Sequence, residues 1–390
     1  MSCPFAGSTA VAPTPVPLAT ALPDAYPEVV NNRYRSIEDP ALVRRILQRP
    51  EDFTPANALD TAIDLEPAAL RILAAERFFL PPVLASAGGA AHLAVRRIVA
   101  RFFSPARVAA QAEPIRARVA GICAGLAADY RNGARVDLAA HLAAAIPPEV
   151  MARLTGIPVP PAADLKAWSL DSLELFWGWP DAARQLELAA SAAGFHAWLR
   201  TSVAQAVARD DGNLYAALHQ GGVDLDRIRS LGYFLTIAGQ ETTAMLISTT
   251  LAAALHEGRW ESCAQETAAA ELVAQSLARA SSVPTWRRVA RADIELDGGR
   301  FAAGEQLVLR LSGGALMEGR DDDSLAFGYG IHRCLGAALA RLETEVVLHT
   351  AARALPGLEP AGGEPEWMHL LSFQWPRTVF SSRPGAGVAA

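Results

Sequence analysis

Apolar side chains recur every three or four positions along most of the chain, and this spacing predicts a fold made mainly of helices. The longest such segment runs from about residue 226 to 256. Shorter segments cover residues 41–48, 90–103 and 337–356. Alanine is abundant in nearly every one, and alanine has the highest intrinsic preference for helix. We therefore predict a mainly α fold with a small β region.

The pattern changes after Ser281, where apolar and polar positions begin to alternate. A period of two residues, interrupted by glycine-containing turns, indicates short strands rather than helices. The strand segments predicted in this way are 283–290, 293–299 with a glycine turn at its end, 301–311 folded about 303–305, and a final hairpin over 370–379.

Three other stretches are interpreted from their breaks and composition. Residues 58–90 are apolar but irregular, and we interpret them as a loop. Residues 108–155 are predicted as two helices, interrupted at Asn132-Gly133 and at Pro147-Pro148. Residues 1–30 are rich in proline and alanine, which indicates an extended or partly disordered arm ahead of a single domain spanning 31–390.

Composition narrows the class of protein. The chain has 390 residues, of which 51% are hydrophobic, so a large core is expected. The net charge of −6 argues against nucleic acid as the main partner. The four cysteines have no zinc-site or disulfide spacing, which favours a reducing, cytoplasmic location. The sequence has no long apolar run and no signal peptide, so we expect no association with a membrane.

One short segment, residues 327–343, concentrates unusual residue types around a cysteine. Gly328, Gly330 and Gly336 allow positive φ and a close approach of the backbone to something flat or bulky. Cys334 comes just before a strong helix former, where free N–H groups and the helix dipole favour a thiolate. A buried thiolate favours a metal, although a lone buried cysteine can also be an ordinary apolar core residue.

A second segment places polar groups inside the longest apolar helix. It reads Ala238-Gly239-Gln240-Glu241-Thr242-Thr243. A glycine within a helix costs about 1 kcal/mol relative to alanine, and a buried carboxylate costs more unless it is paired. Residues that disfavour a buried helix but occur inside one often mark a functional site. The alternative is a kinked core helix whose threonine bonds back to its own turn.

The two segments together resemble the cytochrome P450 family, the haem-thiolate monooxygenases, in its soluble bacterial form. The first matches the pattern F-x-x-G-x-H-x-C-x-G, and the second matches A-G-x-E/D-T. The resemblance covers about residue 33 to the end and implies the cytochrome P450 fold and the cofactor haem b (iron protoporphyrin IX). The positions that carry it are Phe327, Gly330, His332, Cys334 and Gly336 in the loop, and Ala238, Gly239, Glu241 and Thr242 in the helix.

The resemblance also implies roles for these and other residues. Cys334 would be the axial ligand of the iron, and Glu241 with Thr242 would deliver protons for oxygen activation. His92 and Arg96 lie four residues apart on one helix face, and the alternative for them is a solvated basic face. The residues implied as haem-propionate contacts are His92, Arg96, Arg288 and His332, and those implied as substrate contacts are Trp286, Thr285, Phe373, Gln374 and Trp177.

The function implied is monooxygenation, most simply hydroxylation, of a small organic molecule in a bacterial biosynthetic pathway. Because the sequence has no flavin or nicotinamide motif, a ferredoxin and its reductase would supply the electrons. A basic face would suit an acidic ferredoxin, and the substrate could be free or bound to a carrier protein or peptide. The alternatives are oxidative coupling, ring formation or another non-hydroxylating oxidation, and a haem-binding protein without turnover. The arginines of that basic face are Arg96, Arg97, Arg101, Arg107, Arg333 and Arg341.

The sequence departs from the family in one linked pair of features. The family's E-x-x-R pattern here reads Ser276-Leu277-Ala278-Arg279, so the glutamate is missing. The segment between Leu311 and Phe327 is also short and lacks the family's bracing loop. We expect Arg279 to be buried behind the cysteine loop, with main-chain carbonyls and one carboxylate of residues 321–323 as its partners, because an unpaired buried guanidinium is costly.

Overall fold

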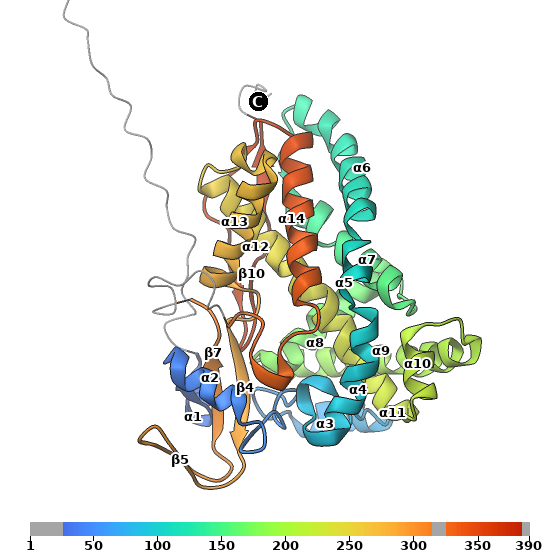
Figure 1. Cartoon of the computed structure of the whole chain (residues 1–390), viewed down its shortest axis with the longest axis vertical. Helices are drawn as coiled ribbons and strands as arrows, with labels where there is room; N and C mark the ends of the chain where they lie inside the picture. Colours follow the sequence, from blue (N-terminus) through green and yellow to red (C-terminus); the bar gives the residue numbers. More distant parts are fainter. Residues whose placement is uncertain (1–25, 314–324, 384–390) are drawn as a thin grey trace, which may run out of the picture.

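The computed structural model describes residues 26–313 and 325–383. Helices make up most of the molecule, and the longest strands, β4 and β7, lie together on one side of it (Figure 1). This confirms the prediction of a mainly α fold with a small β region. Most of the predicted arm lies outside the described residues, and residues 28–33 form a short helix.

One long helical run passes through the centre of the molecule. It consists of α11 (Leu225–Thr236), the π-helical turn η3 (Ile237–Glu241) and α12 (Thr242–His256). Helices α13 (Glu266–Ala280) and α14 (Ala337–Ala354) pack against α12, and α14 also lies beside α6 (Ala112–Arg131), as Figure 1 shows. The buried side chains between them are mostly aliphatic, and this bundle forms the largest part of the core.

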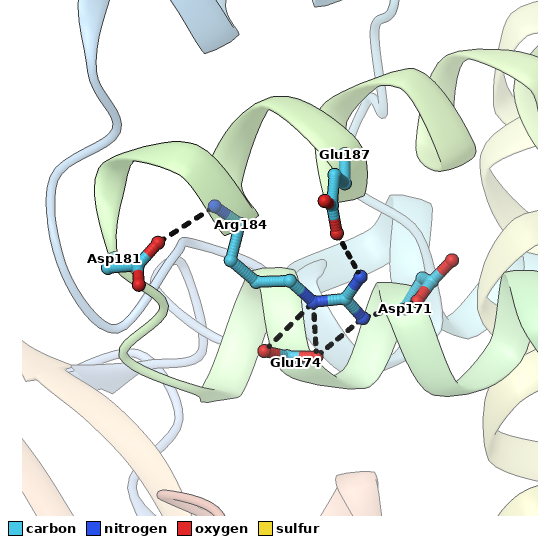
Figure 2. A network of polar contacts seen from close by, with 5 residues as sticks. All are labelled: Asp171, Glu174, Asp181, Arg184 and Glu187. Atoms are coloured by element: carbon cyan, nitrogen blue, oxygen red, sulfur yellow. Dashed lines mark hydrogen bonds and ion pairs between the residues drawn. The ribbon is translucent and has the colours of Figure 1, made fainter.

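A helical hairpin covers another side of the central run. It is formed by α8 (Ala162–Trp177) and α9 (Ala182–Arg209), which pack on each other, on α11 and on η3. Arg184 fixes the elbow of the hairpin, because its guanidinium contacts Asp171, Glu174 and Glu187 (Figure 2). Its main-chain N–H is bonded to Asp181, the N-cap of α9.

The main sheet joins segments from both ends of the chain. Its order is β1 (Arg35–Ile37), β7 (Gln306–Arg310), β4 (Thr285–Ala290) and β2 (Phe53–Thr54). Strand β1 runs parallel to β7, and the other neighbours are antiparallel. The sheet therefore holds β4, which contributes Trp286 and Arg288 to the site, between two other strands.

The prediction of a strand pair folded about 303–305 is wrong. Strand β7 pairs with β4 and β1, whereas β6 (Gly299–Phe301) pairs with β5 (Ile294–Leu296). The turn of that hairpin is Asp297-Gly298, whose φ angles of 55° and 76° are both positive. Two such residues in a two-residue turn match the right-handed twist of the strands, so this turn sets the register.

Two other predictions about the helices are also corrected. The stretch 58–90 contains α3 (Pro67–Ala75), which starts on a proline and packs against α9. The pair Pro147-Pro148 does not interrupt a helix but lies in the first turn of α7 (Ile146–Thr155). Backbone N–H groups in a first turn make no intrahelical hydrogen bond, so proline, which has no N–H, is tolerated there.

No helix within residues 26–313 and 325–383 is long and apolar enough to cross a membrane.

The remaining elements are short or lie at the edges of these layers. These elements are α1 (Glu28–Arg33), α2 (Pro40–Gln48), η1 (Leu84–Ser86), α4 (Gly89–Phe102), α5 (Pro105–Ala109), β3 (Val136–Asp137), η2 (Ala139–Ala143), α10 (Leu214–Gln220), η4 (Ser262–Ala264), η6 (Gly330–His332), β8 (Glu359–Pro360), β9 (Trp367–His369), β10 (Gln374–Pro376) and β11 (Phe380–Ser382).

Candidate active site

A cavity of about 250 Å³ lies where the central helical run, α4, strand β4 and the cysteine loop meet. Most of its lining is apolar. The cysteine loop contributes Cys334 to the lining, and the π turn and the start of α12 contribute Ala238, Gly239 and Thr242. The two segments that the sequence singled out are therefore brought to one cavity, although about 90 residues separate them in the chain.

The side chain of Cys334 is exposed, and the cysteine loop presents it to the cavity. The main-chain N–H of Cys334 donates to the carbonyl of Phe327 over 2.9 Å, which closes the loop. Burial raises the pKa of the Cys334 thiol, and the N–H groups of Gly336 and Ala337 act in the opposite direction, together with nearby guanidinium groups. A thiol in this setting becomes a stable thiolate when a cation binds to it.

The glycines of this loop serve different purposes. Gly328 and Gly330 have φ angles of 69° and 70°, as predicted. A Cβ on Gly330 would also lie 2.8 Å from the carbonyl oxygen of Leu47, so only glycine fits where the loop crosses the end of α2. Gly336 does not have positive φ. It is the N-cap of α14 with φ of −84°, and a Cβ there would lie 3.8 Å from the sulfur of Cys334.

The π turn opens the central helix beside the cavity. The hydroxyl of Thr242 donates to the carbonyl of Ala238 over 2.6 Å, and the hydroxyl of Ser282 donates to the carbonyl of Thr242 over 2.7 Å. The threonine does bond to its own turn, as the alternative interpretation stated, but it does so in a π turn that lines a cavity. Such turns occur frequently at functional sites.

Glu241 does not face the cavity with Thr242. Its carboxylate is 7% exposed and lies 2.6 Å from the ammonium nitrogen of Lys166 on α8, which is 43% exposed. The sequence interpretation missed Lys166. A signal was present, because Lys166 is the only lysine in a chain with 35 lysine and arginine residues. A single ammonium group among so many guanidinium groups marks a position where the two differ in chemistry.

Arg288 on β4 is a buried cation with no counter-charge in the described part of the chain. It lines the cavity, and its one described hydrogen bond goes to the carbonyl of Arg287 over 2.7 Å. Its Nε has no partner among the described residues. Burial lowers the pKa of Arg288 to about 10. A guanidinium held in this way is strongly stabilised when an anion binds to it.

Two histidines lie beside it. The rings of His92 and His332 are 4.5 Å apart. His332 Nε2 donates to the carbonyl of Ala87 over 2.8 Å, and its Nδ1 has no partner among the described residues. Burial, with smaller contributions from nearby positive charges, lowers the pKa of His332 to about 4. His92 lies between the carbonyls of Leu84 and Ile331, at 2.9 and 3.1 Å, so a neutral ring can donate to only one of them.

Arg96 and Phe327 complete the surroundings of the loop. The guanidinium of Arg96 donates to the carbonyl of Arg333 over 2.6 Å, and Arg96 lines the cavity beside His92. The ring of Phe327 lies 5.2 Å from the guanidinium of Arg341, so it packs against the first turns of α14 as well as lining the cavity.

These features fit haem b. An apolar cavity with one thiol suits a flat apolar ring system whose metal needs a ligand from the protein. The buried guanidinium of Arg288, whose Nε has no partner among the described residues, suits a carboxylate group at the edge of such a ring. The fold and the site together define a haem-thiolate enzyme.

Comparison with known proteins agrees. The sequence matches no family model, but it is 30% identical over 286 residues to pentalenic acid synthase of Streptomyces avermitilis, covering 69% of each chain. It is 28% identical to cytochrome P450-SOY of Streptomyces griseus, covering 82% of this chain and 79% of the relative. The solved structure of cytochrome P450 CREJ in complex with (4-ethylphenyl) dihydrogen phosphate superposes with a TM-score of 0.83 at 25% identity, covering 90% of this chain and 92% of that one.

The chain belongs to the cytochrome P450 family, and its relatives are bacterial monooxygenases. Members of this family bind haem b through a cysteine thiolate. The chain spans between 60% and 79% of the length of the first relatives compared.

The residues predicted to contact substrate fall into two groups. Trp177, Trp286 and Phe373 line the cavity. Thr285 and Gln374 are not among the described lining residues, because each is bonded to main-chain carbonyls behind the wall. Thr285 donates to Leu371 over 2.6 Å. Both therefore support the wall instead of forming its surface.

The expectation for Arg279 is wrong. Its side chain is 39% exposed, so it is not buried behind the cysteine loop. It lies 3.5 Å from the carboxylate of Glu257, which is a different partner from the ones expected. The acidic residues 321–323 lie outside the described part of the chain. Ser276 is buried, and its hydroxyl has no partner within the described residues.

A second buried group was also missed. Glu343, in α14, is fully buried, and neither carboxylate oxygen has a described partner. Burial raises its pKa well above the ordinary value, because it disfavours the charged form.

Proposed function

We propose that this cytochrome P450 hydroxylates a small organic molecule in a bacterial biosynthetic pathway, with Cys334 as the axial ligand of haem b and electrons from a separate ferredoxin. The observation that carries the proposal is the shared cavity, which Cys334 enters from the loop and Thr242 enters from the π turn. A sensor or storage protein has no need of a hydroxyl and a buried acid at the turn that faces the ligand.

Haem b supplies, when bound, the chemistry that activates dioxygen. Arg288 would hold a carboxylate of haem b, since its buried Nε has no partner among the described residues, and Arg96, His92 and His332 would complete that edge. The ring of His332 would bind a carboxylate only after Nδ1 takes up a proton, which the negative charge would favour. The apolar lining would exclude water from the reacting groups.

Protons would reach the site through the π turn. Thr242 holds its hydroxyl at the cavity, where it can donate and accept hydrogen bonds. Glu241 is buried behind it and reaches the half-exposed Lys166, which contacts solvent. Glu241 would therefore carry protons between the surface and Thr242, as a general acid and base.

Electron transfer would take place on the side of the cysteine loop. Arg97 and Arg101 are exposed on α4, and Arg333 is exposed in the loop itself. Such a group of positive charges supports the docking of an acidic ferredoxin.

Oxidative coupling or ring formation at the same site is the second candidate. Both reactions use the same ligand and cavity and differ in the fate of the substrate. The test supplies the haem-loaded protein with a ferredoxin, its reductase and labelled dioxygen in the presence of candidate substrates. Hydroxylation adds one labelled oxygen atom to the product, whereas coupling or ring formation removes hydrogen and adds none.

The ligand assignment has its own control. In the reduced protein with carbon monoxide, the long-wavelength absorbance shift typical of thiolate ligation should disappear in Cys334→Ser. It should persist in Cys263→Ser, which changes a buried cysteine of the core. A thiolate spectrum in Cys334→Ser would contradict the proposal.

A further inference from the structure

Three aromatic rings from three different elements form one wall of the cavity. Trp177 ends α8, Trp286 lies in β4, and Phe373 lies just before β10. The ring centroids of Trp177 and Phe373 are 4.9 Å apart at an interplanar angle of 76°, and those of Trp286 and Phe373 are 6.2 Å apart at 82°. The rings thus meet edge to face, which is a favourable geometry for aromatic pairs.

The hydroxyl groups along this wall are hydrogen-bonded, whereas the indole N–H of Trp177 has no partner among the described residues. Ser282 and Thr285 donate their hydroxyls to main-chain carbonyls over 2.7 and 2.6 Å. The indole nitrogen of Trp177 is buried, so a molecule in the cavity meets the carbon surface of that ring and not its N–H group. The wall therefore offers a ligand mainly aromatic carbon, and none of its three residues carries a charge.

The charged groups that line the cavity have another role. They come from α4, from Arg288 and from the cysteine loop, and the proposed function assigns them to the carboxylates of haem b. None of the three aromatic residues is paired with a free charge that faces the cavity. The guanidinium of Arg287 lies 5.6 Å from the ring of Trp177 and is bound by the carbonyls of residues 58 and 60.

The wall is held rigidly. The carbonyl of Trp177 accepts the N–H of Leu371 over 2.8 Å, and the carbonyl of Leu371 accepts the hydroxyls of Thr285 and Tyr26. The end of α8 is fixed further by the contacts of Glu174 with the guanidinium at the elbow (Figure 2). A flat, rigid ring loses little conformational entropy when it binds to a rigid wall of this kind, whereas a flexible chain as ligand loses more.

We propose that the part of the substrate held in this cavity is an uncharged aromatic ring. This inference rests on the proposed function for the presence of haem b, and it adds the class of substrate. Aromatic contacts are worth a few-fold to about tenfold in affinity each, beyond the area they bury. A carboxylate or ammonium group placed against this wall would have no group of opposite charge there among the described residues.

The test compares three molecules with the same nine-carbon bicyclic skeleton, namely indane, octahydroindene and indane-2-carboxylate. Their dissociation constants are measured by equilibrium dialysis against the haem-loaded full chain, without reductant. Octahydroindene is the more hydrophobic hydrocarbon, so burial of apolar surface alone would favour it. We expect indane to bind about tenfold tighter than octahydroindene, and the carboxylate to bind weakest.

Two variants locate the preference. Trp286→Leu and Phe373→Leu remove one ring each and should lower the ratio between indane and octahydroindene about three- to tenfold, from about ten to between about three and one. Trp367→Leu is the matched control, since Trp367 lies on β9, stacks on His369 and is not a described lining residue. It should leave the ratio unchanged.

Equal or tighter binding of octahydroindene by the unchanged protein would overturn the inference, and so would the absence of binding by all three molecules. A ratio that survives both ring variants would overturn the assignment to this wall. Because the assay uses no reductant, its failure is distinct from a failure of the monooxygenase function, which the labelled-oxygen assay reports.

Discussion

The ammonium nitrogen of Lys166 lies 2.6 Å from a carboxylate oxygen of Glu241, and this ion pair joins the α8–α9 hairpin to the π turn of the central helix. The only lysine of the chain thus contacts the buried acid next to Thr242. The position of the hairpin and the charge beside the π turn are therefore linked.

The first prediction concerns this pair. Lys166→Met leaves a nearly buried carboxylate without a counter-charge, so we expect it to lower the free energy of unfolding by about 1–2 kcal/mol. Adding Glu241→Gln to that variant should recover most of the loss, because the unpaired charge is then gone. Urea unfolding of the single and double variants measures both effects, and Lys166→Arg serves as the charge-preserving control. Losses that simply add in the double variant would show that the two side chains do not interact.

The second prediction concerns the hydroxyl of Thr242. Thr242→Ala should retain haem and bind substrate as before, while less product forms per electron and more hydrogen peroxide is released. The reason is that proton delivery at the cavity then lacks its hydroxyl. Product, peroxide and consumed reductant are measured together. Thr250→Ala is the matched control, since Thr250 makes the same kind of bond to its own helix, over 2.8 Å to Leu246, but is not a described lining residue of the cavity. An unchanged yield in Thr242→Ala would contradict the role.

The third prediction separates haem binding from stability. Arg288 is a buried cation without a described anionic partner, so Arg288→Met should weaken haem retention about tenfold or more while leaving the apoprotein as stable as before, or more stable. Transfer of haem to an acceptor protein measures retention, and urea unfolding of the apoprotein measures stability. Arg287→Met is the control: it removes the donor to the carbonyls of Ala58 and Asp60, so it should destabilise the apoprotein. Normal haem retention in Arg288→Met would refute the assignment.

The fourth prediction concerns pH. His196 on α9 is buried, 3.6 Å from Glu76, which also contacts Arg200, and this cluster ties the end of α3 to α9. Burial lowers the pKa of His196, while Glu76 raises it, and Arg229 and Arg200 lower it further. The unfolded chain therefore binds a proton more readily than the folded one, so stability falls as the pH drops through about 6.5.

We expect His196→Gln to reduce the fall in the free energy of unfolding between about pH 7 and pH 5. Urea unfolding at fixed haem content across this range measures it. His219→Gln, at an exposed position on α10, is the control and should keep the wild-type slope. An identical pH dependence in wild type and His196→Gln would exclude His196 as a source of acid sensitivity.

The sequence predicted those parts of the site whose chemistry is local in the chain. The cysteine loop and the π turn each place their polar and glycine residues within ten positions, so burial and backbone arguments apply directly to Cys334 and Thr242. It did not predict the pair of Lys166 and Glu241, whose members lie 75 positions apart, because only the packing of α8 on η3 brings them together.

The same reason explains the errors. The resemblance to the family predicts Arg279 behind the cysteine loop, but its position on α13 directs the side chain to Glu257 at the end of α12. The strand after residue 305 was paired with its neighbour in sequence, whereas the positive φ angles of Asp297-Gly298 put the hairpin one strand earlier. A register set by a turn is visible in sequence only when the turn is identified correctly.

The π turn over residues 237–241 has a consequence for how the chain tolerates changes of length. A π turn accommodates one residue more than an α-helix of the same span, so the faces of α11 and α12 keep their registers on either side of it. A variant that lacks Gln240 should therefore form one uninterrupted helix with both flanking cores still matched, and should fold. Its cavity would lose the opened carbonyl of Ala238 and the placement of Thr242. The extra residue of the π turn would then shape the site, whereas the fold could form without that residue.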